Sequence, residues 1–369
     1  MANEFLTNAK KVKNDEFYTQ YSDIQKEIEA YLEYDPNVFR GKVVYCNCDD
    51  PFESNFFRYF VLNFNKLRLK RLITTSYKPS PVANTQLQLF GDDKTITKVK
   101  GRPKITANKF IINKVKDVDG DGEFNLKDVA KQLRTNKHNE WTPLEGDGDF
   151  RSEESVDLLK QSDIVVTNPP FSLFREYIKQ LVDFGKKFLI IGNMNAITYK
   201  EVFPLLRDNK VWLGNNYKVN AGAMFFEIPE KIANLEQVRE VKTNESGKKV
   251  YITRVQGIRW FTNIDHGRRH EPLQLMTEKE VIKFTTKKPF EKYDNYNAIE
   301  VSLVKNIPSD YKGMMGVPVS FLDNYNPDQF EILGSNRGVD QDPNKIYGKG
   351  SYLNGKEVYK RLFIKHRKK

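Results

Sequence analysis

The tetrapeptide Asn-Pro-Pro-Phe is the part of this sequence whose residue types best suit a chemical step, and it consists of Asn168, Pro169, Pro170 and Phe171. It directly follows Asp163–Thr167, an apolar run that predicts a short strand. The Asn168 side-chain oxygen and the Pro169 carbonyl are acceptors, and consecutive prolines fix the backbone and offer no N–H donor. This rigid edge can accept both N–H bonds of an aromatic amine and turn the nitrogen lone pair toward an electrophilic methyl group.

Phe171 indicates what the amine would belong to. An aromatic face beside the two acceptors can stack on a nucleobase, and enzymes that act on a base must first flip it out of the duplex. The predicted chemistry is therefore methylation of an exocyclic amine on a base. A proline-rich turn is the other interpretation of the tetrapeptide in isolation, but its position between a strand and a helix favours a site.

A second stretch, Gly148-Asp149-Phe150, precedes the predicted helix Glu153–Gln161. A carboxylate beside a phenyl ring suits the adenine group of S-adenosylmethionine, because the first binds its amine and the second covers its ring. A cap at the start of the helix is the other interpretation of Asp149.

The elements that must position these residues alternate between strands and helices. Such alternation predicts an α/β fold with a mainly parallel sheet and helices on both faces. Ligands of such sheets bind beyond the carboxyl ends of the strands, so we expect the chemistry in the loops after Tyr45, Thr167 and Ile191. The predicted strands are Lys42–Cys46, the end of 67–76, Asp163–Thr167 and Lys187–Ile191, and the predicted helices are Glu53–Asn63, Glu153–Gln161 and Leu173–Phe184.

Two regions depart from this alternation. Residues from about 78 to 136 are polar with short alternating runs, which predicts a hairpin-rich insertion. Beyond about residue 265, short segments are broken by Pro, Gly and Asn, which predicts a smaller carboxy-terminal lobe of mixed structure. The predicted domains are therefore a catalytic domain over 1–265 and a lobe over 266–369.

The insertion contains the spacing of a calcium-binding loop. Oxygen-bearing side chains occupy loop positions 1, 3, 5, 9 and 12, and glycine occupies position 6. Position 12 is Asp where a bidentate Glu is usual, and the preceding segment resembles a strand. A structural calcium ion and a plain polar turn both stay open, and the ligands of the first would be Asp117, Asp119, Asp121, Asn125 and Asp128.

The charge balance points to a polyanionic partner. The chain has 60 Lys and Arg against 49 Asp and Glu, a formal net charge of +11, which favours nucleic acid without requiring it. Basic residues are interleaved with aromatic residues over 258–270, and the tail 360–369 is also basic. Each of these runs alone is also typical of a solvated surface. Core packing is the other interpretation of Trp260. The candidate DNA-binding residues are Arg254, Arg259, Trp260, Arg268 and Arg269.

Several protein classes are disfavoured. No window approaches the roughly 18 apolar residues of a membrane span, and the amino terminus lacks the apolar core of a secretory signal, so we expect a cytoplasmic protein with no membrane partner. The two cysteines, Cys46 and Cys48, are too close for an ordinary disulfide. Neither follows a proline, which argues against a cytosine-ring methylase with a cysteine nucleophile.

Across most of its length the sequence resembles the EcoRI family of adenine-specific DNA methyltransferases. The matching stretches are Asn14–Gln20, Tyr45–Pro51, Gly146–Ser152, Asp163–Arg175, Trp260–Asn263 and Met315–Pro318. The resemblance implies a Rossmann-like S-adenosylmethionine-dependent methyltransferase sheet, with Asn168–Phe171 holding the target adenine and target recognition in the carboxy-terminal lobe. It also implies a cofactor site made of Phe17, Tyr18, Thr19, Cys46, Asn47, Cys48, Asp49, Asp50, Asp149 and Phe150.

The sequence departs from the usual methyltransferase pattern in two places. The glycine-rich loop after the first strand is replaced by Asn47–Asp50, and no carboxylate follows the second strand at Thr74–Ser76. The individual cofactor contacts therefore stay open, with Asp49 or Asp50 as substitutes for the missing acid.

The expected partner is double-stranded DNA bound by a monomer, and a cognate restriction endonuclease encoded nearby is an open question. The Asn-Pro-Pro-aromatic signature also serves enzymes that methylate glutamine side chains or RNA adenines. The net charge and the predicted lobe argue for nucleic acid over protein. A DNA-binding module with an inactive site is the non-enzymatic alternative, and the intact tetrapeptide argues against it.

Overall fold

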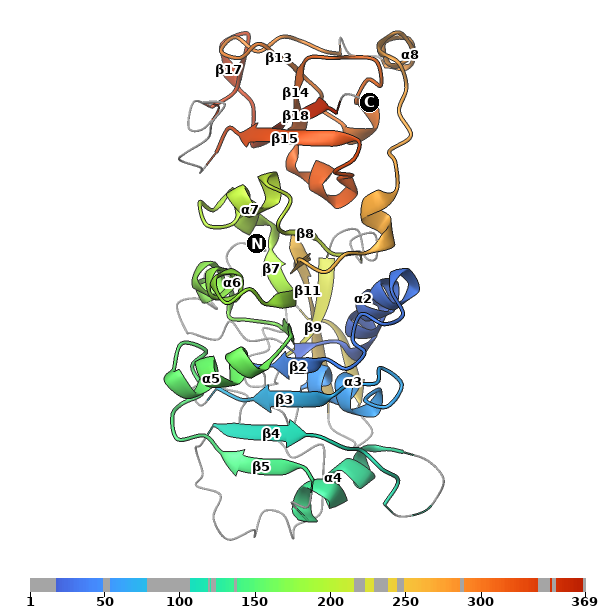
Figure 1. Ribbon diagram of the computed structural model, residues 1–369. Coiled ribbons are helices and arrows are strands. Elements are labelled where there is room, and N and C mark those ends of the chain that lie inside the picture. Colours follow the sequence, from blue (N-terminus) through green and yellow to red (C-terminus); the bar gives the residue numbers. More distant parts are fainter. Residues whose placement is uncertain are drawn as a thin grey trace. The chain divides into compact units, whose positions relative to one another are not determined.

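The computed structural model is a mixed α/β protein (Figure 1). It describes residues 18–48, 54–77, 107–118, 120, 124–135, 138–215, 223–228, 238–243, 249–285, 289–337, 346 and 350–367. The chain forms two compact units, Met1–Asn193 with Asn216–Ile264, and Met194–Asn215 with Asp265–Lys369. The second unit thus includes a segment, 194–215, that the sequence analysis had assigned to the catalytic domain.

A large mixed sheet forms the centre of the first unit. Neighbouring strands pair in parallel in the order β3-β2-β6-β7, and antiparallel strands flank them, with β4 and β5 beside β3 and β12 beside β7. Both β2 and β6 are buried along their whole length, as expected of parallel strands covered on both faces. The strands are β2 Val43–Cys46, β3 Arg71–Thr75, β4 Asn108–Ile112, β5 Glu140–Pro143, β6 Ile164–Thr167, β7 Lys187–Asn193 and β12 Ile258–Thr262.

The helices of the first unit have clear local causes. Two of them begin at a serine cap, and another buries a regular apolar face. Ser54 accepts hydrogen bonds from the backbone N–H groups of Phe56 and Phe57 at the start of α3, and Ser152 does the same for Ser155 at the start of α5. The buried face of α6 has helical spacing and consists of Phe174, Tyr177, Ile178 and Leu181. The helices of this unit are α2 Tyr21–Tyr34, α3 Asn55–Leu62, α4 Leu126–Thr135, α5 Glu153–Gln161 and α6 Phe174–Asp183.

A smaller antiparallel sheet of the first unit has the strand order β1-β9-β11-β10. Its strands are β1 Tyr18–Thr19, β9 Ala223–Ile228, β10 Val238–Thr243 and β11 Lys249–Gln256. Side chains of β9 and β11 share one apolar core with the central sheet, because Phe226 and Val255 belong to the same buried cluster as Val44 and Val166. The amino-terminal strand β1 is therefore held by a strand about 200 residues later in the chain.

Part of the predicted insertion belongs to the central sheet. Strand β4 pairs with β3 in antiparallel register, with Leu72 opposite Ile112, and β5 pairs with β4. Phe110 and Ile112 are fully buried, so the alternation within 109–115 marks a strand that extends the sheet and not an isolated hairpin. Residues 94–100, whose alternating pattern also predicts a strand, lie outside the described residues.

The second unit is built on a sheet of order β13-β14-β18-β15, in which β13 and β14 are parallel and the other neighbours are antiparallel. The division of the chain into a catalytic domain over 1–265 and a lobe over 266–369 stays a prediction. No helix within the described ranges is long and apolar enough to span a membrane. The elements are α7 Phe203–Arg207, β8 Trp212–Leu213, α8 Glu278–Phe284, β13 Ala298–Glu300, β14 Met314–Pro318, β15 Phe330–Ser335, β16 Tyr352–Leu353, β17 Lys356–Glu357 and β18 Arg361–His366.

Candidate active site

The Asn-Pro-Pro-Phe loop lies at the carboxyl end of β6, as predicted from the run before it. Asn168 is 4% exposed, and Phe171 starts a 3₁₀ turn that leads into α6. The backbone N–H of Leu173 donates to the Pro170 carbonyl at 3.0 Å, so this carbonyl closes the turn. Phe171 is half-buried and packs against the core of the unit. The loop therefore holds Asn168 in a largely water-excluded position while part of the phenyl ring stays accessible.

The end of β2 meets the end of β6, because the two strands are parallel neighbours. The Thr167 hydroxyl donates to the backbone carbonyl of Asn47, directly before Asn168 in the chain. Asn47 and Cys48 are both buried, and Cys48 has a left-handed backbone with φ 71°. This conformation is one that glycine adopts without strain, so the chain turns at Cys48, just after the end of β2.

Gly148 brings the Asp149–Phe150 stretch against the end of β3. Its φ is +79°, and a Cβ atom at this position would lie 2.0 Å from the backbone oxygen of Ser76, the residue that follows β3. Any larger residue would push the two segments apart. The carboxyl ends of β3, β2 and β6 are thus the places where the predicted cofactor and target residues converge.

Asp149 is held as an ionised carboxylate by Arg151. Arg151 Nη2 lies 2.7 Å from Asp149 Oδ2, Arg151 Nε lies 2.9 Å from Oδ1, and the Arg151 backbone N–H also donates to Oδ1. These hydrogen bonds lower the pKa of Asp149 below its usual range. Ser152 and not Asp149 caps α5, so the helix-cap interpretation of Asp149 is wrong.

Phe150 packs beneath α6. Its ring is 5% exposed and meets the ring of Tyr177 edge to face, with centroids 4.9 Å apart. The Gln180 side chain donates to the Phe150 carbonyl at 3.1 Å. Because α6 follows the Asn-Pro-Pro-Phe loop directly, the same helix contacts both candidate sites.

The amino-terminal strand reaches this region through Thr19. Its backbone oxygen accepts a hydrogen bond from the Asn55 side chain at 2.8 Å, and Asn55 is the first residue of α3. Thr19 is 1% exposed. Phe17, the Tyr18 side chain, Asp49 and Asp50 lie outside the described residues.

Comparison with known proteins identifies the family of this chain. A family model described as adenine-specific methyltransferase EcoRI matches residues 5–367. The chain belongs to this family. It is 42% identical to the Type II methyltransferase M.EcoRI of Escherichia coli over 366 residues, which cover 99% of this chain and 97% of that protein.

Two mycoplasma proteins are also similar. The chain is 35% identical to the Type II methyltransferase M.MpnI of Mycoplasma pneumoniae over 374 residues, and 35% identical to M.MgeORF184P of Mycoplasma genitalium over 373 residues, with 98% of each chain covered. No solved structure gives a significant match. Membership over nearly the whole length makes this chain an adenine-specific DNA methyltransferase.

Within the first unit, the predicted DNA-binding tryptophan is part of the core. Trp260 is 2% exposed, lies opposite Ile191 on β7, and contacts the ring of Phe56 edge to face. A DNA contact would require this side chain to leave its packing. Arg254 on β11 and Arg259 on β12 are half-buried, and their role toward DNA stays a prediction.

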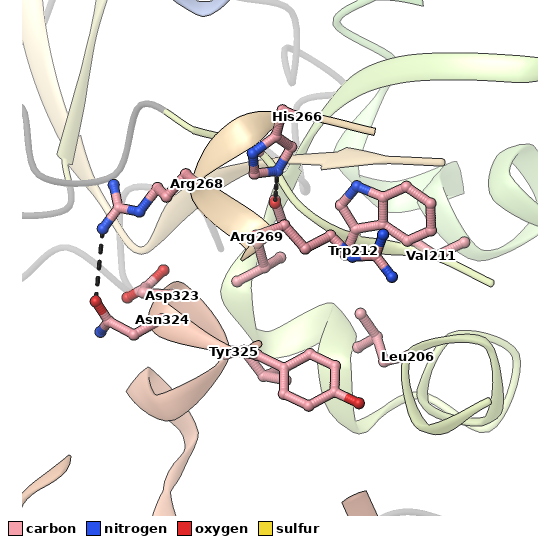
Figure 2. A pocket seen from close by; sticks show the side chains of 12 residues that line it. Leu206, Val211, Trp212, His266, Arg268, Arg269, Asp323, Asn324 and Tyr325 are labelled. Atoms are coloured by element: carbon pink, nitrogen blue, oxygen red, sulfur yellow. Dashed lines mark hydrogen bonds between the residues drawn. The ribbon is translucent and has the colours of Figure 1, made fainter. Parts of the chain in front are cut away.

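In the second unit, Arg268 and Arg269 line a small pocket (Figure 2). The Arg269 guanidinium lies 3.7 Å from the centroid of the Trp212 ring and bonds to Asp265 at 3.1 Å. Arg268 donates to the Asn215 carbonyl at 2.9 Å. Both arginines therefore connect 194–215 to the segment after residue 264 within this unit, and a DNA contact would compete with these bonds.

The described residues do not support the predicted calcium ion. Asp128 is fully buried, and its carboxylate accepts the backbone N–H groups of Val118 at 2.7 Å and Asn125 at 2.9 Å. Asp117 accepts the N–H of Gly120 at 2.7 Å. The two carboxylates therefore accept backbone N–H groups. No cluster of metal-ligating side chains occurs in the described part of the chain. Asp119 and Asp121 fall outside that part.

Two residues of the site were missed by the sequence analysis. Arg151 holds Asp149, and its place two residues later in the same stretch was a signal that went unused. Tyr177 contacts Phe150 and donates to the Asn47 side chain. Its position on the buried face of a predicted amphipathic helix was a second signal, since a buried tyrosine hydroxyl needs a hydrogen-bond partner.

Proposed function

We propose that this chain transfers a methyl group from S-adenosylmethionine to the exocyclic N6 amine of an adenine flipped out of duplex DNA, and that Asn168–Phe171 holds that adenine. The observation that carries the proposal is the burial of Asn168 at the carboxyl end of β6, beside the end of β2. The parallel order β3-β2-β6-β7 with antiparallel β12 beside β7 supports a Rossmann-like methyltransferase sheet.

The acceptors that we assign to the amine are the Asn168 side-chain oxygen and the Pro169 carbonyl, whereas the Pro170 carbonyl accepts the Leu173 N–H in the turn. Two N–H···O bonds favour a tetrahedral nitrogen whose lone pair attacks the methyl carbon, and they strengthen as positive charge develops on the amine. The N–C bond forms as the S–C bond breaks, and an amine proton leaves to solvent. The Phe171 ring covers one face of the extruded base.

S-adenosylmethionine supplies the electrophilic methyl group on its sulfonium sulfur, and the residues near the strand ends fit it. Asp149 is ionised and its side chain is 18% exposed. Its Oδ1 accepts the bonds of the Arg151 backbone and Nε, whereas Oδ2 accepts that of Nη2. A carboxylate oxygen has two lone pairs, which leaves Oδ2 with a position for the adenine amine. Phe150 would support the adenine ring, and Asn47 with Cys48 would contact methionine and ribose.

Target recognition is assigned to the second unit, together with Arg254 and Arg259. The net charge of +11 supports phosphate contacts that hold the duplex in register. The Type II designation of the relatives supports a restriction–modification role, in which a cognate endonuclease would cut the same unmodified sequence. A monomer suffices for this chemistry, because the transfer needs one target and one methyl donor.

The decisive experiment measures transfer of a labelled methyl group to duplex DNA, RNA and protein substrates in parallel. We expect label in duplex DNA alone, as N6-methyladenine at one sequence, which modification-sensitive sequencing of expressing cells would identify. Label in RNA or in protein glutamine, with none in DNA, would replace the proposal by one of these alternatives. Absence of cofactor binding by calorimetry would favour an inactive DNA-binding module.

A further inference from the structure

Tyr177 is a fully buried tyrosine whose two ends contact two different parts of the candidate site. It lies in α6 with 0% exposure. Its hydroxyl donates to Oδ1 of Asn47, and its ring meets the Phe150 ring with centroids 4.9 Å apart. One side chain thus connects the loop after β2 with the stretch proposed to hold the cofactor's adenine.

Asn47 also accepts a hydrogen bond from a hydroxyl group on the other side of the Asn-Pro-Pro-Phe loop. Thr167, the last residue of β6, donates to the Asn47 backbone carbonyl. Thr167 precedes the loop and Tyr177 follows it, so the two donors bracket Asn168–Phe171. The loop after β2 and the loop after β6 therefore share one hydrogen-bonded residue, Asn47, which is itself 4% exposed.

We propose that Tyr177 is a positioning residue for methyl transfer: its hydroxyl fixes the Asn47 side chain, and through Asn47 it holds the cofactor loop and the target loop at one separation. This inference rests on the proposed function of the two loops. Direct transfer requires the amine nitrogen and the methyl carbon to be aligned at near contact, and small displacements of either loop are costly. Neither Tyr177 nor Asn47 needs to contact the target adenine. Tyr177 therefore acts on the relative positions of the two loops.

The protonation of the pair is suited to this role. Burial raises the pKa of Tyr177 well above its usual value, so its hydroxyl remains a donor at every working pH. An amide oxygen can only accept, which makes the direction of the bond unique. Substitution by Phe would keep the ring contact with Phe150 and remove only the donor, leaving a buried oxygen without that bond.

The test compares Tyr177→Phe with the wild-type enzyme and with Tyr31→Phe, which removes the hydroxyl of an equally buried tyrosine on α2. We expect Tyr177→Phe to lower kcat/KM by about 10- to 100-fold and to weaken S-adenosylmethionine binding, while the Kd for DNA stays unchanged. Tyr31→Phe should alter only thermal stability. A purely structural role for Tyr177 would lower the melting temperature of both variants and leave the kinetic constants of the folded enzyme unchanged, which would overturn the proposal.

A double-mutant cycle tests whether the effect passes through Asn47. We expect Asn47→Ala to reduce kcat/KM, and Tyr177→Phe to change it less than about twofold further in that background, because coupled residues are non-additive. Independent, multiplying effects would contradict the coupling. If Tyr177→Phe does not fold, Asn47→Ala carries the test, and unchanged kcat/KM in that variant would overturn the inference. A wild-type enzyme that methylates no DNA would instead refute the proposed function.

Discussion

Arg151 and Asp149 form a bidentate ion pair, with Nη2 2.7 Å from Oδ2 and Nε 2.9 Å from Oδ1. The pair fixes the orientation of the carboxylate that we assign to the cofactor's adenine. Arg151 also bonds to Glu176 on α6 at 2.9 Å, so the carboxylate is tied to the helix that follows the target loop.

This pair predicts a specific pH dependence. The hydrogen bonds from Arg151 lower the pKa of Asp149, so its charged form stabilises the folded state above the unfolded-state pKa of about 3.9, and this stabilisation is lost as the pH falls through the lower folded-state pKa. In Arg151→Ala the Asp149 carboxyl should titrate at a higher pH. Carboxyl-carbon NMR of both proteins measures this, and identical titration curves would show that the pair does not control the group.

Asn168→Ala should reduce kcat by about 100-fold or more, because the lost acceptor acts mainly in the transition state. The variant should still fold and bind DNA, because the change is a truncation at one end of a short loop. Single-turnover rates and DNA binding measured side by side test this. Turnover near the wild-type value would refute the assignment of the loop.

Cys46 and Cys48 should take no covalent part in the reaction. Methyl transfer to an amine is direct, and both thiols are buried with no role in the step we describe. Incubation of the wild-type enzyme with DNA and cofactor should give no denaturation-resistant protein–DNA adduct, and the double replacement by Ala should likewise give none. A trapped adduct that disappears in the double variant would mean a cysteine nucleophile.

Gly148→Ala should be more destabilising than Gly120→Ala. Both glycines have positive φ, +79° and +76°, so both substitutions strain the backbone, but only Gly148 would place its Cβ against Ser76, at 2.0 Å from the carbonyl oxygen. We expect an additional loss of about 1–3 kcal/mol for Gly148→Ala, together with weaker S-adenosylmethionine binding. Chemical denaturation and calorimetry measure the two effects, and equal losses for the two variants would contradict the close approach.

The Asp117–Asp128 loop should be stabilised by Asp128 itself. Asp128→Ala removes the acceptor of two backbone N–H groups in a buried position, which should cost about 1–3 kcal/mol of the free energy of unfolding for each group left unsatisfied. Calcium and a chelator should give the same melting curve for the wild-type protein. A calcium-dependent rise in the melting temperature would restore the metal site.

The sequence analysis predicted β2, α3, β6, α6 and β7 within a few residues, because the three strands are short apolar runs and the two helices carry apolar residues at helical spacing. It placed the Asn-Pro-Pro-Phe loop at a strand end for the same reason. The interpretation of Trp260 depended on strand pairing, which the local sequence pattern does not contain. A segment rich in basic and aromatic residues can form a DNA-binding surface or a buried strand. The pairing of this segment with Ile190 and Ile191, some 70 residues earlier, shows that it is a strand.

The same limit applies to the second unit and to the calcium spacing. Residues 194–215 pack with the segment after 264 through contacts such as Arg269 with Trp212, which no periodicity reveals. The spacing of Asp117 to Asp128 is compatible with both a metal and backbone-capping carboxylates, because a carboxylate at either end of the loop can bind a cation or accept backbone N–H groups. Hydrogen bonds to Val118 and Asn125 distinguish the two only in three dimensions.

The pairing of β1 with β9 also sets an order of events during synthesis. Tyr18 lies opposite Glu227, so the strand containing Thr19 has no partner strand until the ribosome has added about 200 further residues. At roughly 5–20 residues per second, that delay is on the order of 10–40 seconds. The segment that the family resemblance assigns to the cofactor site must therefore wait, whereas the parallel strands β3, β2, β6 and β7 have all been synthesised before β9. A nascent chain would carry its target loop well before it could hold a methyl donor, and would remain unable to modify DNA until most of the protein had been translated.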